Sequence, residues 1–314
     1  MSGEPLRPDA FSTALTEAVP EIAKLAQLEV RIVFNLDSSD VGPRHWKRLA
    51  CEIDEARQDF DGFVIVHGTD TMAYTASALS FALLHLGKPV ILTGAQRPLG
   101  ALRTDAKRNL VDAVELATRG VEGVGICFDG LLLRGAHATK SNVHDYRAFD
   151  SPNAPPWARL GVDVVFEDRQ PRQGGSYTFR PDFDASVMVI HVSPGMPADY
   201  FRDTFKSEGG IRGLVLAAYG LGTVPTASPD VAAMVGEAVE AGIDVLVVTQ
   251  SAGNIDLDKY ENSRALRDVG AISGGEMTLE AAVTKLMHGL ANFGDRQSRR
   301  TYLLSNLAGE RTSP

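Results

Sequence analysis

Short apolar runs alternate with segments of helical periodicity along most of the chain, and this alternation constrains the fold more than any other feature. Such a rhythm is typical of a parallel sheet covered by helices. We predict strands at residues 30–36, 63–66, 89–93, 124–128, 187–192, 213–218 and 245–249. The run at residues 63–66 is apolar throughout, as expected for a parallel strand buried on both faces. The sequence therefore predicts an α/β protein with a doubly wound parallel sheet.

Helices are predicted between these strands from apolar residues at helical spacing. They fall around residues 46–56, from Met72 onward, around residues 110–116 and at residues 278–290, with a further helix at residues 10–15 capped by Asp9. The stretch 168–183 is rich in Arg, Gln, Gly and Pro and lacks apolar periodicity, which indicates a linker. We therefore predict a larger N-terminal domain at residues 1–167, a linker at 168–184 and a smaller C-terminal α/β domain at 185–314.

Composition places the chain among globular proteins, with 44% hydrophobic and 23% charged residues. The formal net charge of -9 argues against nucleic acid or an anionic membrane surface as partner. No signal peptide and no run able to span a bilayer is visible. The two cysteines, Cys51 and Cys127, suit neither a metal site nor a redox pair. These features predict a cytoplasmic protein without a membrane partner.

Polar residues follow three of the predicted strands. They are Asp37-Ser38-Ser39, then Gly68-Thr69-Asp70-Thr71, then Thr93-Gly94-Ala95-Gln96-Arg97. In open α/β sheets, ligands bind beyond the carboxyl ends of the strands. None of these segments has the glycine spacing of a dinucleotide loop or a P-loop, and the histidines form no ligand cluster. We therefore predict a small-molecule site here, with no cofactor and no metal.

Thr69 and Asp70 allow two interpretations. Both residue types are good helix N-caps, and an acid there suits the helix dipole. Alternatively, Thr69 offers a hydroxyl for nucleophilic or water-activating work, and Asp70 offers a negative charge for a substrate ammonium. A threonine hydroxyl needs a base at neutral pH. Lys140, in a polar, turn-like stretch, is a candidate base if it is desolvated, although most lysines are solvated surface residues.

Longer motifs resemble the asparaginase/glutaminase family, and in detail the cytosolic type I L-asparaginases. The resemblance covers nearly the whole chain and is carried by the following segments: Asp37-Ser38-Ser39-Asp40; His67-Gly68-Thr69-Asp70-Thr71-Met72; Thr93-Gly94-Ala95-Gln96-Arg97-Pro98; Arg134-Gly135 with Thr139-Lys140; Gly274-Gly275-Glu276-Met277-Thr278; and Thr284-Lys285-Leu286.

This resemblance implies a two-domain asparaginase fold and hydrolysis of L-asparagine to L-aspartate and ammonia. It implies that Thr69, Asp70 and Lys140 act together, with Lys140 polarising Thr69 directly or through water. Asp70 would hold the substrate α-ammonium. Ser38 would hold the α-carboxylate, with Asp37 and Ser39 lining the same loop. The resemblance also implies a homodimer or homotetramer in which a neighbouring copy of the chain completes the site.

One family motif, Thr-Gly-Gly-Thr-Ile at the end of a first strand, does not occur in these 314 residues. In the family its first threonine is the usual nucleophile that forms the acyl-enzyme. We expect the natural protein to begin upstream of Met1 and to include that motif. A chain beginning at Met1 would lack a central strand, and we expect unpaired strand edges, a large void, poor solubility and no turnover.

Two further functions remain open. One is the asparaginase-like component of a tRNA-dependent amidotransferase, which needs a partner. The other is a catalytically inactive amino-acid-binding or regulatory protein, since Ser38 and Asp70 could hold an amino acid without a nucleophile.

Overall fold

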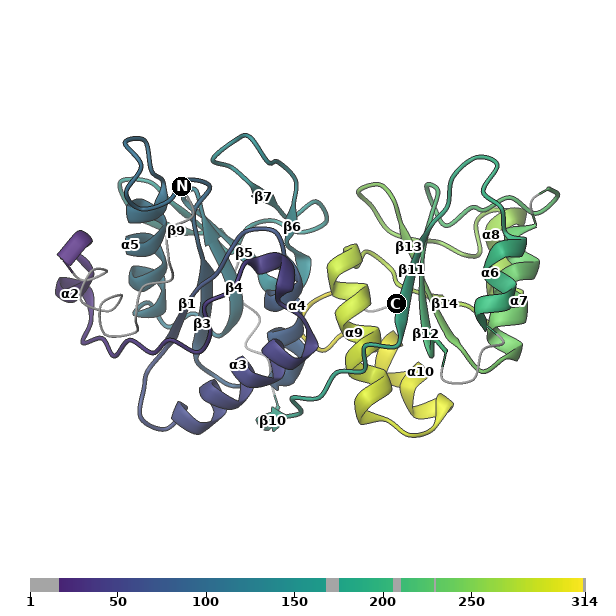
Figure 1. Ribbon diagram of the computed structural model, residues 1–314, viewed down its shortest axis with the longest axis horizontal. Helices are drawn as coiled ribbons and strands as arrows, with labels where there is room; N and C mark the ends of the chain where they lie inside the picture. Colours follow the sequence, from purple (N-terminus) through teal and green to yellow (C-terminus); the bar gives the residue numbers. More distant parts are fainter. Residues whose placement is uncertain (1–16, 168–174, 206–209, 229, 313–314) are drawn as a thin grey trace. The chain divides into compact units, whose positions relative to one another are not determined.

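The computed structural model describes residues 17–167, 175–205, 210–228 and 230–312, which form two compact units, residues 1–181 and 182–314 (Figure 1). The predicted helix at residues 10–15 and much of the predicted linker lie outside the described residues. Part of the linker is ordered, because Thr178–Phe179 (β10) pairs antiparallel with Leu83–Leu84 (β2). No helix in the described ranges is both long and apolar enough to cross a bilayer.

The first unit is built on a six-stranded sheet in the order β1-β3-β4-β5-β8-β9. Its strands are β1 (Phe63–Val66), β3 (Pro89–Thr93), β4 (Gly123–Phe128), β5 (Leu131–Arg134), β8 (Ala158–Leu160) and β9 (Val164–Phe166). β1, β3 and β4 are parallel, whereas β5, β8 and β9 join antiparallel. The predicted parallel sheet is present in β1, β3 and β4, and three antiparallel strands that the sequence did not predict extend it. A two-residue turn, Asp129-Gly130, connects β4 to β5, and both its residues have positive φ, so the chain reverses in a tight hairpin instead of crossing over.

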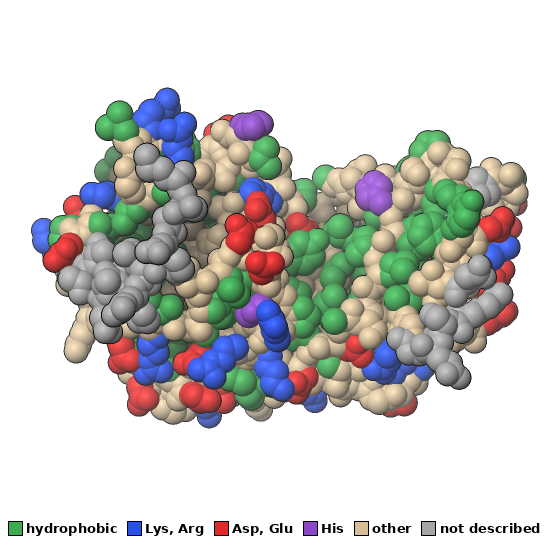
Figure 2. Space-filling view, in the orientation of Figure 1, with side chains coloured by type: hydrophobic (Ala, Val, Ile, Leu, Met, Phe, Trp, Pro, Cys, Tyr) green, Lys and Arg blue, Asp and Glu red, His purple; other side chains and the backbone are tan. Residues whose placement is uncertain are grey.

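Helices cover both faces of this sheet. They are α2 (Ile22–Leu25), α3 (Pro43–Ala56), α4 (Met72–Ala82) and α5 (Ala106–Ala117). α5 packs on β1, β3 and β4, while α4 packs on β3 and β4 and carries α3 on its outer side. α4 is buried on nearly all sides, so its Ala- and Ser-rich sequence lets it pack closely against the sheet. In Figure 2, acidic and basic side chains intermingle over the edge of the unit where α3 lies, as on an ordinary solvated surface.

The predicted strand at residues 30–36 does not form, and this prediction was wrong. The segment has the alternating pattern of a strand, but it pairs with no described strand. A strand needs a neighbour for its backbone hydrogen bonds. Between this segment and β1 lies a cavity of about 1410 Å³.

The second unit has a four-stranded parallel sheet in the order β11-β12-β13-β14. Its strands are β11 (Val187–His191), β12 (Gly213–Ala218), β13 (Asp244–Thr249) and β14 (Ile272–Ser273), and its helices are α6 (Asp199–Phe205), α7 (Val231–Glu240), α8 (Glu261–Asp268), α9 (Leu279–Asn292) and α10 (Arg296–Leu304). β12 is buried along its whole length and forms the centre of the core. The three predicted strands and the helix at 278–290 agree with β11, β12, β13 and α9.

Candidate active site

The carboxyl ends of β1 and β3 bring the predicted polar segments together. β1 ends at Val66 and continues into the turn Gly68–Thr71, and β3 ends at Thr93 and continues into the loop that holds Gln96. The two ends lie very close, because a Cβ built at Gly94 would stand 2.2 Å from the carbonyl oxygen of His67. Only glycine allows this approach, which explains the residue at that position.

The turn 68–71 rests on Ser38, which starts a short 3-10 helix, η1 (Ser38–Asp40). The backbone N–H of Asp70 donates to Ser38 Oγ at 3.3 Å, and the Thr71 hydroxyl donates to the Ser38 carbonyl at 2.6 Å. A Cβ at Gly68 would stand 2.7 Å from Ser38 Oγ. Ser38 is buried. Its contacts fix η1 and the turn 68–71, which lie 30 or more residues apart in sequence, against each other.

Asp37 and Ser39 flank Ser38 on the exposed side of the same turn. Asp37 caps the turn, since its carboxylate accepts from the Ser39 N–H at 2.9 Å and the Ser39 hydroxyl at 2.7 Å. These hydrogen bonds lower the pKa of the Asp37 carboxyl. Asp37 and Ser39 thus stabilise the shape of their own loop. Of the three residues 37–39, the buried Ser38 is the one that contacts the turn 68–71.

Lys140 lies at the centre of the cluster. It belongs to the short strand β6 (Thr139–Lys140), which pairs with β7 (Phe149–Asp150). Its Nζ donates to Thr69 Oγ1 at 2.7 Å and to Asp70 Oδ1 at 2.6 Å. The Lys140 side chain is 16% exposed and that of Asp70 is 64% exposed. The amine is thus mostly covered, while the carboxylate keeps a face open to a ligand.

Helix capping does not account for Thr69 and Asp70. The N-cap of α4 is Thr71, and the helix begins at Met72. Thr69 and Asp70 precede the cap, and their side chains contact the amine of Lys140 instead.

Gln96 joins this cluster although the sequence alone did not single it out. The Thr69 hydroxyl lies 3.5 Å from Gln96 Oε1, and Gln96 Nε2 donates to the Asp145 carbonyl at 3.0 Å. Asp105 fixes the loop by accepting from the N–H groups of Gln96 and Arg97. The place of Gln96 just after a strand with a polar end was the available signal.

His67 supports the turn from below. Trp46 Nε1 donates a hydrogen bond to Thr75 Oγ1 at 3.1 Å. Thr75 Oγ1 lies 3.0 Å from His67 Nε2, and His67 Nδ1 lies 2.6 Å from the Gly68 carbonyl oxygen. Burial lowers the pKa of His67, so the ring is neutral at pH 7. A neutral ring that accepts from Thr75 must carry its proton on Nδ1 and donate it to Gly68.

Comparison with known proteins agrees with this arrangement. The family profile "Asparaginase, N-terminal" matches residues 2–172, and "Glutaminase/Asparaginase C-terminal domain" matches residues 186–303. This chain belongs to the glutaminase/asparaginase family. The family and the two-domain asparaginase fold predicted from the motifs are therefore confirmed.

Three similar proteins illustrate the range of relatives. The chain is 38% identical to L-asparaginase 1 of Escherichia coli over 281 residues, covering 88% of this chain and 82% of the relative. It is 34% identical over 311 residues to a component of the glutamyl-tRNA(Gln) amidotransferase of Pyrococcus horikoshii, covering 95% of this chain and 70% of that relative. The crystal structure of L-asparaginase I from Vibrio cholerae superposes with a TM-score of 0.88 at 33% identity, covering 99% of this chain and 95% of that chain.

Proposed function

We propose that this protein hydrolyses L-asparagine to L-aspartate and ammonia. The observation that carries the proposal is the contact of Lys140 Nζ with both Thr69 Oγ1 and Asp70 Oδ1. An amine, a hydroxyl and a carboxylate from two distant parts of the chain meet in a fold that the chain shares with relatives named asparaginases.

Asp70 binds the α-ammonium of the substrate in this proposal, and Ser38 binds its α-carboxylate. The exposed face of Asp70 is open to a cation. The Ser38 oxygen accepts from the Asp70 N–H, so its own hydroxyl proton is available for a carboxylate. The turn 68–71 and η1 beneath it thereby present an acceptor for the ammonium next to a donor for the carboxylate.

Lys140 serves as the base in this proposal. Its amine contacts both Thr69 Oγ1 and Asp70 Oδ1, and it accepts the proton of the Thr69 hydroxyl, or of a water held by it, as the amide carbonyl is attacked. In the threonine-based acyl-enzyme mechanism of the family, the first threonine of the Thr-Gly-Gly-Thr motif attacks the amide first. Thr69 and Lys140 then have the supporting role.

Ammonia release from L-asparagine, with L-glutamine as comparison, tests the proposal in the protein extended upstream of Met1 by the expected Thr-Gly-Gly-Thr segment. We expect Lys140→Met to lower kcat at least a hundredfold, whereas Lys107→Met, at an exposed lysine of α5, leaves kcat unchanged. Binding of L-aspartate, measured by calorimetry, should weaken in Asp70→Asn. Hydrolysis that survives Lys140→Met would contradict the assigned role.

A second candidate is the asparaginase-like component of a tRNA-dependent amidotransferase, because the amidotransferase relative from Pyrococcus horikoshii matches 95% of this chain. Co-purification with a partner protein and transfer RNA would favour it. Binding of L-aspartate without ammonia release would favour a catalytically inactive amino-acid-binding protein. We also propose a cytoplasmic homodimer or homotetramer, and light scattering of the purified protein tests its assembly.

A further inference from the structure

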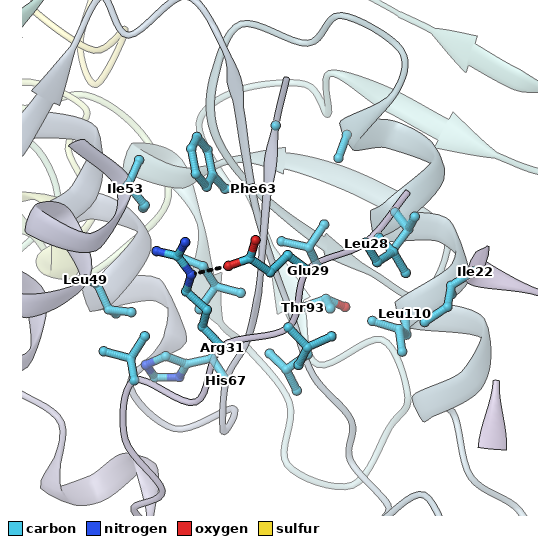
Figure 3. A pocket seen from close by; sticks show the side chains of 18 of the residues that line it. Ile22, Leu28, Glu29, Arg31, Leu49, Ile53, Phe63, His67, Thr93 and Leu110 are labelled. Atoms are coloured by element: carbon cyan, nitrogen blue, oxygen red, sulfur yellow. Dashed lines mark hydrogen bonds and ion pairs between the residues drawn. The ribbon is translucent and has the colours of Figure 1, made fainter. Parts of the chain in front are cut away.

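The two halves of the candidate active site are anchored differently. Thr69 follows β1, whose end is held in the main sheet, because the His67 N–H donates to the Thr93 carbonyl at 2.8 Å. His67 and Thr93 both line the cavity beside β1 (Figure 3). Lys140 lies outside that sheet, in β6, whose partner among the described strands is β7. A hairpin with two residues in each strand is marginally stable by itself, so other contacts must keep the Lys140 amine in place.

The base of this hairpin is buried, but its loop is not. Phe149 of β7 is 2% exposed, and its ring packs edge-on against Phe128 of β4 with the centroids 5.1 Å apart. Lys140 pairs with Phe149 across the hairpin. Beyond Lys140 the chain leaves this anchor, since residues 141–145 and 147 are exposed. The proposed base therefore stands where a buried anchor passes into an exposed loop.

Side-chain hydrogen bonds join this loop to the two ends of one other loop of the first unit, as far as the described residues show. Gln96 Nε2 donates to the Asp145 carbonyl at 3.0 Å. The Tyr146 hydroxyl donates to the Arg103 carbonyl. Tyr146 is also the one residue of 141–147 that is partly buried. The tyrosine thus turns toward the unit and tethers the far side of the loop.

The acceptor of the Tyr146 hydroxyl belongs to a braced loop. The Asp105 carboxylate accepts from the Arg97 N–H at 3.0 Å. The Thr104 hydroxyl donates to the Arg97 carbonyl at 2.9 Å and accepts from the N–H of Ala106, where α5 begins, at 3.0 Å. Arg103 directly precedes Thr104, so its carbonyl is presented from a position that α5 holds in place.

We propose that Tyr146 is a positioning residue for the hydrolysis of asparagine. Its hydroxyl holds the loop 141–147 against Arg103 and thereby keeps the Lys140 amine 2.7 Å from Thr69 Oγ1. The inference rests on the proposed function, in which Lys140 is the base. Tyr146 acts through the chain between it and Lys140, and a base transfers a proton only within hydrogen-bond reach of its partner.

The anchoring of the site predicts which kinetic constant depends on Tyr146. Asp70 and Ser38, which bind the substrate in the proposed function, belong to the turn 68–71 and to η1, and they contact each other directly. A looser loop 141–147 leaves that contact intact and displaces Lys140. Substrate binding should therefore persist while the chemical step slows, since small misplacements of a catalytic group are costly.

The kinetic test is Tyr146→Phe, which removes the hydroxyl alone, in the protein extended upstream of Met1. We expect kcat for L-asparagine to fall roughly tenfold while KM stays within about twofold. Two controls should leave both constants unchanged: Tyr200→Phe, at a tyrosine of α6 that is 79% exposed, and Val143→Ala, at a 68% exposed residue of the same loop that takes part in neither tether. An unchanged kcat in Tyr146→Phe, a higher KM in its place, or an equal loss in Val143→Ala would overturn the inference.

Labelling of lysines with acetic anhydride follows Lys140 without any substrate. In Tyr146→Phe we expect the acetylation rate of Lys140, measured by mass spectrometry, to rise at least threefold as the amine leaves its two acceptors. Lys259, an exposed lysine of the second unit, is the internal reference and should not change. Faster labelling of both lysines together with a lower urea midpoint would mean that the hydroxyl serves stability alone, and the inference would be wrong.

Hydrogen exchange reports on the loop itself. The N–H groups of Ser141 and Asn142 donate to the Ala148 carbonyl at 2.9 Å and 3.2 Å, and both should exchange at least fivefold faster in Tyr146→Phe. Unchanged exchange and labelling would show that Tyr146 does not hold the loop. Absence of ammonia release from the parent protein would instead contradict the proposed function, whereas the labelling of Lys140 still decides whether Tyr146 positions the amine.

Discussion

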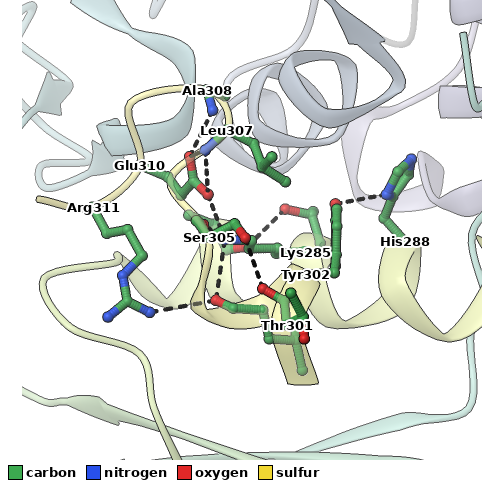
Figure 4. Close-up of polar contacts among 12 residues, drawn as sticks. Lys285, His288, Thr301, Tyr302, Ser305, Leu307, Ala308, Glu310 and Arg311 are labelled. Atoms are coloured by element: carbon green, nitrogen blue, oxygen red, sulfur yellow. Dashed lines mark hydrogen bonds and ion pairs between the residues drawn. The ribbon is translucent and has the colours of Figure 1, made fainter. Parts of the chain in front are cut away.

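Replacing Glu310 tests how the second unit holds its C-terminal residues. Lys285 of α9 and Glu310 form an ion pair whose two side chains are fully buried. Lys285 Nζ also donates to the carbonyls of Leu303 and Ser305, and Glu310 accepts from the N–H groups of Leu307 and Ala308. Figure 4 shows this group together with the Tyr302–His288 contact. The pair joins a helix to the loop that follows α10.

Glu310→Gln leaves the Lys285 ammonium buried without its counter-charge, while the amide oxygen can still accept from the loop N–H groups. Breaking a buried pair by removing one partner costs about 3–5 kcal/mol. We expect a loss of that size at pH 7 in the free energy of unfolding of the second unit. Removing both charges with Lys285→Met and Glu310→Gln should recover a large part of the loss, because no buried charge then remains.

The loss should shrink as the pH rises. Burial lowers the pKa of Lys285 below its ordinary 10.5, and the Glu310 carboxylate opposes that shift. Without Glu310 the pKa falls further. At a pH between the pKa of Lys285 in the folded chain and its higher pKa in the unfolded chain, the unfolded chain binds more protons. The free energy of unfolding of the variant therefore rises with pH, by at most about 1.4 kcal/mol per pH unit.

Native-state hydrogen exchange of the α9 amides measures this free energy for the unit itself, which matters because two units need not unfold together. Lys259→Met, at an exposed lysine of the same unit, is the control and should change exchange little. A cost of Glu310→Gln below about 1 kcal/mol at pH 7, or a double variant no more stable than the single one, would contradict the stabilising role of the buried ion pair.

Two variants test the supports of the candidate active site. Thr75→Val keeps the side-chain volume but removes the oxygen shared by Trp46 and His67. We expect the free energy of unfolding in urea to fall by about 2–4 kcal/mol. Thr75→Ser keeps the oxygen and should lower it by less than about 1 kcal/mol. Gln96→Met removes the donor to the Asp145 carbonyl; we expect faster hydrogen exchange in residues 141–147 and about a tenfold lower kcat with little change in KM. Unchanged exchange in that loop would contradict a role for Gln96 in holding it.

The sequence pattern correctly predicted the strands that are buried on both faces. It failed where the formation or direction of a strand depends on the neighbouring strand with which it pairs. The apolar runs at residues 89–93 and 213–218 agree with β3 and β12, which are buried at every residue, and the run at 63–66 agrees with β1, which is only partly buried. Residues 30–36 have an equally good pattern, yet the pattern cannot report whether a neighbouring strand is present. The antiparallel addition of β5 was missed for a related reason, since it depends on the turn at Asp129-Gly130 rather than on the strands.

The candidate active site was predictable in its residue types but not in its contacts. The strand-end rule identified Thr69 and Asp70, the polar, turn-like stretch around Lys140 made that residue a candidate base, and the family resemblance joined the three. The distance of 2.7 Å between Lys140 and Thr69 spans 71 positions of sequence. It depends on the hairpin of β6 and β7, two strands of two residues each, which are too short to leave a periodic pattern.

Contacts within the described chain hold Thr69, Asp70 and Lys140 in place. Ser38 lies beneath the turn 68–71, Asp105 holds the loop of Gln96, and the β6–β7 pair carries Lys140. The three supports come from separate segments of the chain, so the loss of one contact should loosen one side of the site and leave the other two in place.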